Sequence, residues 1–144
     1  MSVAADKNHP LLELRGLRTY FHTEEGTARA VDGVDFVVNK GETLGVVGES
    51  GCGKSTTAKM MLMLEQPTEG NILFQGQDIF EIDSGKRKEY RSSVQAVFQD
   101  PWSSLNPRMR VRDIIAEPMV INWSLSRWEL RDRVEKLLVD VGLN

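Results

Sequence analysis

The residues best suited to chemistry lie in one short stretch: Gly48, Glu49, Ser50, Gly51, Cys52, Gly53, Lys54 and Ser55. Their types and spacing match the pattern G-x-x-x-x-G-K-[S/T], whose glycines let successive backbone N–H groups point at one phosphate. A lysine at the position of Lys54 reaches the β- and γ-phosphates of a nucleotide as a point charge. The Ser55 hydroxyl is placed to bind Mg²⁺, and Thr56 can add a hydroxyl near the α-phosphate. The stretch predicts a nucleotide site that includes magnesium.

The same stretch allows plainer interpretations. A glycine-rich entry to a helix can exist without a ligand. Cys52 stands at a variable position of the pattern. It is either filler in the loop or a redox-active thiol.

A strand and a helix must flank such a loop, and the sequence predicts both. Residues 43–47 form a near-continuous apolar run, typical of a strand buried on both faces of a parallel sheet. From Lys54 to about Leu64 apolar residues recur at helical spacing, and Pro67 marks the exit. The predicted order of strand, glycine loop and helix is the context that the pattern requires.

Further strands are predicted on both sides of this unit. Residues 11–21 and 28–38 favour two antiparallel strands, joined by the polar turn 22–27. Short strands are expected at residues 71–74, 77–80 and 94–98, the last of them buried.

Helices are predicted in the remaining segments. Residues 84–92 are strongly charged and favour a solvated helix. Residues 111–121 are helical in pattern, but Pro118 should kink or end that helix. The last helix begins with the S-x-x-E spacing of a capping box at Ser126 and stops at Gly142. Its apolar stripe consists of Leu130, Val134, Leu137, Leu138 and Val141.

Length and composition set the outer limits. The 144 residues suffice for one domain, with 40% hydrophobic and 27% charged residues, an ordinary soluble profile. The net charge of −3 gives no positive field that would hold a polyanion, so nucleic acid is not expected as a partner. The single Cys52 cannot form an internal disulfide, which favours a reducing cytoplasm. No apolar run has the length of a signal peptide or a membrane span.

The segment beyond the loop resembles a known family. The residues VFQDP at 97–101 and WSSLNPRM at 102–109 resemble the Q-loop segment of the ATP-binding subunits of ABC transporters. Within that family they are most similar to the dipeptide and oligopeptide, or nickel, importers. Other pieces agree in order: AVDGV at 30–34, GETLG at 41–45, PTEG at 67–70 and DIIAEP at 113–118. The resemblance extends from Leu11 onward.

The resemblance implies an α/β fold of the P-loop NTPase, RecA-like class. In this class a parallel core is joined by an N-terminal antiparallel β-subdomain and by a helical subdomain, of which only the start would be present. Residues 1–144 would be the N-terminal part of a single ABC-type nucleotide-binding domain. The implied parts are a disordered tail at 1–10, the β-subdomain and phosphate-loop core at 11–100, and the Q-loop and start of the helical subdomain at 101–144.

The family also implies roles for two residues outside the loop. Gln99 matches the Q-loop glutamine, whose amide oxygen contacts Mg²⁺ and the attacking water. An uncharged amide can bind and release a hard cation without the burial of a full charge. Phe21 stands where the family places a ring that stacks on adenine, with Tyr20 as the alternative. Gln99 can also be an ordinary strand-end residue, and Phe21 can be plain core.

Several family motifs do not occur in these residues: the S-G-G-Q signature, the Walker B Asp, the catalytic Glu and the later His. We therefore expect the chain to be a fragment that lacks a general base, so that hydrolysis by these residues alone is not expected. The missing strands would also leave residues 43–48 partly exposed.

The implied cofactors and partners are ATP, Mg²⁺, a second ATP-binding subunit, identical or different, and transmembrane permease subunits. The permease would dock at the Q-loop region, near Arg108, Arg110 and Arg112. This places the protein peripherally on the cytoplasmic side of the inner membrane.

Three functions remain open at this point. The first is an ATPase subunit that energises the import of peptides or a related small solute. The second is a module that binds a nucleotide without turnover. The third is an ABC ATPase without membrane partners, which the net charge and the peptide-importer pattern at 99–109 disfavour.

Overall fold

The computed structural model describes residues 9–24, 26–100 and 105–143. The expected tail at 1–10 lies mostly outside the described residues, as do residues 101–104 of the segment that resembles a Q-loop. The chain divides into two compact units, residues 1–95 and 96–144, and each is described by itself. The expected division at residue 100 stays a prediction.

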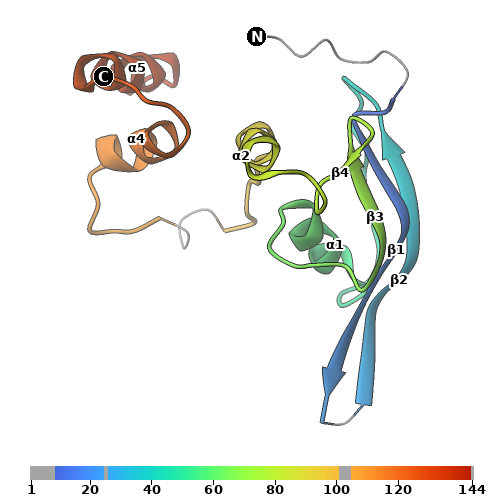
Figure 1. The fold of residues 1–144 in the computed structure, drawn as a ribbon. Coiled ribbons are helices and arrows are strands. Elements are labelled where there is room, and N and C mark those ends of the chain that lie inside the picture. Colours follow the sequence, from blue (N-terminus) through green and yellow to red (C-terminus); the bar gives the residue numbers. More distant parts are fainter. Residues whose placement is uncertain (1–8, 25, 101–104, 144) are drawn as a thin grey trace. The chain divides into compact units, whose positions relative to one another are not determined.

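The first unit is built on a four-stranded antiparallel sheet (Figure 1). Its strands are β1 (Leu12–Thr23), β2 (Gly26–Val38), β3 (Glu69–Phe74) and β4 (Gln77–Asp78), in the order β2-β1-β3-β4. The predicted N-terminal hairpin is confirmed, and its strands run further into the turn than expected, because pairing continues to Thr23 and Gly26.

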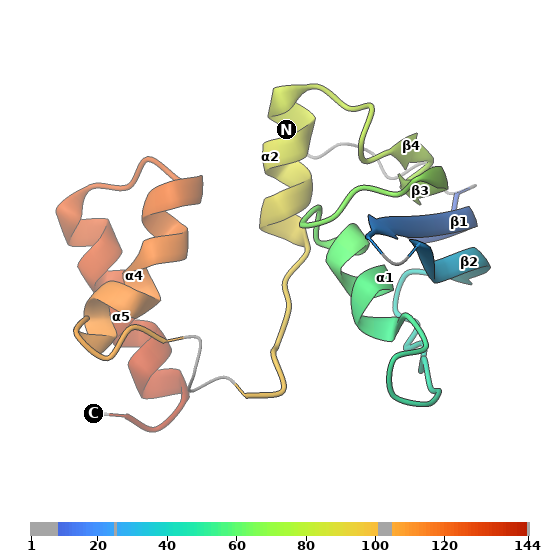
Figure 2. The ribbon, with the colours of Figure 1, turned by 90° about the horizontal axis from the view of Figure 1, so that it is seen from below.

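The helices α1 (Lys54–Met61) and α2 (Ser84–Ser93) lie on the same side of this sheet (Figure 2). The core between them contains Leu14, Leu17, Val31, Met60, Ile72, Ile79 and Tyr90. Thr19 is buried on the helix-facing side of β1, and its hydroxyl donates to the Met60 sulfur at 2.7 Å. The Tyr90 hydroxyl donates to the Met61 carbonyl and thereby joins α2 to the end of α1.

The second unit is a helical pair, α4 (Val111–Asn122) and α5 (Arg127–Asp140). The predicted capping box is present: the Ser126 hydroxyl accepts the Glu129 N–H, and the Glu129 carboxylate accepts the Ser126 N–H. Val134 is buried between the helices with Leu130 and Leu138 beside it. Leu137 and Val141 of the expected stripe are exposed, so its packed part consists of Leu130, Val134 and Leu138.

Pro118 does not end α4, which continues to Asn122. A proline inside a helix removes one backbone hydrogen bond. Ala116 and Met119 on either side of it are buried against α5, so tertiary packing supports the helix where its local preference is weak.

Two predicted strands of the parallel core are not formed. Residues 43–47 and 94–98 carry no strand pairing, and Val47 and Val97 are 92% and 95% exposed. A buried strand needs neighbours that accept and donate its backbone hydrogen bonds, and no described strand pairs with either segment. The expected exposure of residues 43–48 is confirmed.

Candidate functional site: the phosphate loop

Gly53 ends the loop and starts α1. Its φ of 94° lies in the left-handed region, where a side chain is strained. A Cβ added there would lie 2.3 Å from the Ala30 carbonyl oxygen and 3.2 Å from the Val31 side chain. The backbone of β2 therefore approaches the loop so closely that only glycine fits, and this contact fixes the start of α1 against the sheet.

Lys54 reaches back across the loop. Its ammonium donates to the carbonyl oxygens of Gly48 at 2.8 Å and Glu49 at 2.6 Å, and lies 3.4 Å from the Cys52 sulfur. The loop thus holds a positive charge by its own backbone at the place where the sequence predicts phosphate.

The first turn of α1 is open to an anion. Gly53 supplies no side-chain cap, and the turn contains no acidic residue. The N–H groups of a first turn have no partner within the helix, and the helix dipole adds a partial positive charge there. An oxyanion is therefore favoured at this end of α1.

The hydroxyl residues after Lys54 differ in their surroundings. Ser55 is exposed and Thr56 is half-buried, so both can serve a ligand. Thr57 is buried, and its hydroxyl donates to the Gly53 carbonyl at 3.0 Å, which stabilises the turn behind the loop. The other predicted loop residues, Gly48, Glu49, Ser50, Gly51 and Cys52, are exposed.

A cavity of about 430 Å³ adjoins the loop. Gly51, Gly53, Lys54 and Thr57 line one side, and β2 and residues 46–47 line the rest. Arg29 of β2 also lines this cavity, which sequence reasoning missed, and its guanidinium lies over the Tyr20 ring. The available signal was its place in the predicted hairpin, where it pairs with Tyr20 of β1.

The two aromatic candidates are neighbours in β1 but have different surroundings. Tyr20 is already engaged: its hydroxyl donates to Asp32 at 2.6 Å, and the Arg29 guanidinium lies 5.6 Å from its ring. The Tyr20 hydrogen bond lowers the pKa of Asp32 and raises that of Tyr20. Phe21 is 38% exposed and remains the better candidate for stacking.

Gln99 is exposed and lies in the second unit, whereas Ser55 and Lys54 lie in the first. The joint binding of Mg²⁺ by Gln99 and Ser55 therefore stays a prediction.

Comparison with known proteins decides the family. The model of the family described as ABC transporter matches residues 31–144. The chain belongs to the ABC transporter family. It is 47% identical over 150 residues to the oligopeptide transport ATP-binding protein AppF of Bacillus subtilis, and 41% over 149 residues to the dipeptide transport ATP-binding protein DppF of Haemophilus influenzae. Each match covers 99% of this chain and 46% of the relative, so the chain spans about half the length of these relatives.

Solved structures agree on the fold. The ATP-binding cassette MJ0796, in a dimeric post-hydrolysis state bound to ADP and Pi, matches with a TM-score of 0.72 at 23% identity, over 88% of this chain and 55% of that one. CbiO1 from Clostridium perfringens, part of an ABC transporter complex, matches with a TM-score of 0.70 at 26% identity, over 95% and 52%. The expected class of an incomplete P-loop NTPase is confirmed. Within the described ranges, no helix is long and apolar enough to cross a membrane.

Proposed function

We propose that this chain is the ATP-binding part of an ATPase subunit that energises the uptake of peptides or a related small solute. The observation that carries the proposal is the Lys54 ammonium, which the loop carbonyls hold beside an uncapped helix start. The peptide class follows from the relatives, which are named for oligopeptide and dipeptide transport.

The residues of the loop fit ATP and magnesium. The open first turn of α1 and Lys54 supply donors for phosphate oxygens, and no carboxylate of that turn opposes them. Among the described residues, no group of three or more His, Cys, Asp or Glu could hold a metal ion. Mg²⁺ would therefore be held mainly by phosphate oxygens, with the Ser55 hydroxyl and the Gln99 amide as protein ligands. Phe21 would stack on the adenine.

The proposed partners follow from the same family. A second ATP-binding subunit, identical or different, would face the loop across a dimer, as the dimeric neighbour suggests. Permease subunits would dock at the Q-loop region, which places the subunit peripherally on the cytoplasmic side of the membrane. Two alternatives differ from this proposal. A non-hydrolysing module would bind ATP without turnover, and a soluble ABC ATPase would have no permease partner.

The test uses the complete protein in cells that take up a labelled tripeptide through it. Lys54→Ala should abolish uptake, whereas Lys59→Ala, an exposed lysine on the same helix, should leave it intact. Gln99→Ala should retain ATP binding but lose turnover. Uptake that persists in Lys54→Ala contradicts the proposal. Turnover without a co-purifying membrane subunit favours a soluble ATPase, and ATP binding without turnover favours the non-catalytic module.

A further inference from the structure

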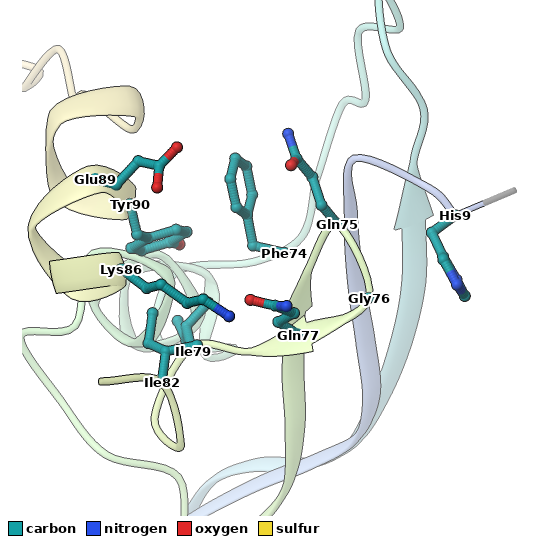
Figure 3. Close-up of a pocket in the computed structure, with 10 residues that line it drawn as sticks. All are labelled: His9, Phe74, Gln75, Gly76, Gln77, Ile79, Ile82, Lys86, Glu89 and Tyr90. Atoms are coloured by element: carbon teal, nitrogen blue, oxygen red, sulfur yellow. The ribbon is translucent and has the colours of Figure 1, made fainter. Parts of the chain in front are cut away.

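A second concave site lies between α2 and the turn that joins β3 to β4 (Figure 3). Its volume is about 390 Å³, within the range of small-molecule sites. Tyr90, at its base, donates to the carbonyl of Met61, the last residue of α1. The site therefore adjoins the opposite end of α1 from the phosphate loop, and nothing in the proposed ATPase function uses it.

The floor of this cleft is apolar. The Phe74 and Tyr90 rings meet edge to face with their centroids 5.1 Å apart, and Ile79 and Ile82 lie below them. Burial raises the pKa of Tyr90 to about 12, so its hydroxyl stays a neutral donor to Met61 and the floor carries no charge. Such a floor receives an aliphatic or aromatic side group.

The rim carries charges of both signs. Lys86 and Glu89 leave α2 on either side of Tyr90 (Figure 3). They stand three apart on one helix, a spacing at which opposite charges commonly pair, yet neither forms an ion pair within the described part of the chain. The acid closest to Lys86 in sequence on its amino side is Asp83, whose carboxylate already accepts the N–H groups of Gly85 and Lys86.

An amide completes the rim from the opposite side. Gln77 projects from β4 toward the Lys86 side chain (Figure 3). Its side chain makes no hydrogen bond to any other described residue. The cleft thus offers a cation, an anion and an amide above an apolar floor.

We propose that this cleft binds a small zwitterion with an apolar side group, of the size of an amino acid or a dipeptide. Glu89 receives the ligand's ammonium group, Lys86 receives its carboxylate, and the Phe74 and Tyr90 rings receive its side group. Gln77 donates to or accepts from the polar backbone of the ligand.

The experiment is calorimetric titration of the full chain with four probes: leucine, the dipeptide Leu-Leu, its N-acetyl derivative and its C-terminal amide. Leucine and Leu-Leu distinguish the two sizes of ligand. Each blocked dipeptide should bind about fivefold more weakly than Leu-Leu, the effect of one partly screened charge pair. Lys86→Gln should remove the preference for a free carboxylate, and Glu89→Gln the preference for a free ammonium group.

Lys88→Gln is the matched control, because Lys88 is exposed on α2 but does not line the cleft. It should leave all four affinities unchanged. The proposal is overturned if neither leucine nor Leu-Leu binds, if the blocked dipeptides bind as well as Leu-Leu, or if Lys88→Gln acts like Lys86→Gln. Because each variant keeps the phosphate loop, an ATP titration of the same sample tests the nucleotide site separately.

Discussion

The helices α1 and α5 begin in opposite ways. At α5 the Ser126 hydroxyl and the Glu129 carboxylate satisfy backbone N–H groups of the first turn reciprocally. At α1 the position before the helix is Gly53, with no side-chain cap and no acidic residue in the turn. A capped start stabilises the helix, whereas an uncapped start leaves donors for a ligand. The start of α5 is satisfied by its own side chains, whereas the start of α1 leaves N–H donors for the proposed phosphate.

The largest expected effect is on ATP binding, and it follows from loss of the charge at the uncapped start of α1. Lys54→Ala removes the cation that the loop carbonyls hold, and should weaken ATP binding by about 3 kcal/mol, or about 100-fold in Kd. Titration with a fluorescent ATP analogue measures this. An unchanged Kd would remove Lys54 from the site, and Lys59→Ala is the control for a charge elsewhere on α1.

The next effect is on the free energy of unfolding, and it follows from the backbone geometry at the uncapped start of α1. Gly53→Ala forces a side chain into a positive φ and against the Ala30 carbonyl, and should lower the free energy of unfolding by about 2 kcal/mol. Gly45→Ala is the control, because a Cβ there meets no atom within 4 Å and the backbone is not left-handed. Urea unfolding of both variants checks the prediction. Equal stabilities would show that the loop does not depend on its contact with β2.

A smaller effect is expected at the capped start of α5. Ser126→Ala removes the cap of α5 and should lower the free energy of unfolding by about 1 kcal/mol, while ATP affinity stays unchanged. Ser124→Ala, a neighbouring exposed serine outside the helix, should change neither quantity. A change in ATP affinity upon loss of the Ser126 cap would contradict the claim that only the start of α1 affects ATP binding.

The smallest effect is the pH dependence of the free energy of unfolding that comes from the capped starts of α5 and α2. The hydrogen bond from Ser126 lowers the pKa of Glu129, and the backbone N–H groups of Lys86 and Gly85 lower that of Asp83. A lowered pKa in the folded state means that this stability is fully present above the ordinary pKa of about 4 and is lost as the pH falls through the lowered value. Urea midpoints between about pH 6 and pH 3 should fall less steeply in Glu129→Gln than in the unchanged protein. Equal pH dependence of the urea midpoints in the two proteins would contradict a lowered pKa of Glu129.

Local signals in the sequence predicted most of what the structure shows. The S-x-x-E spacing at Ser126 and the Gly-Lys start of α1 involve residues within one turn, and both are confirmed. The strands at 43–47 and 94–98 failed for a non-local reason. An apolar run indicates a preference for burial, but a strand forms only beside a partner, and sequence composition does not supply one. The close approach of Ala30 to Gly53, and the place of Arg29 beside the cavity, depend on the same kind of long-range contact.

The most direct test of the account compares the two helix starts in one sample. Backbone amide NMR spectra recorded during addition of Mg-ATP should show large shifts for Lys54, Ser55 and Thr56 at the start of α1. The amides of Arg127, Trp128 and Glu129 at the start of α5 should stay in place. Unmoved amides at α1, or shifts of equal size at both helix starts, would contradict the claim that the uncapped end of α1 is the phosphate site.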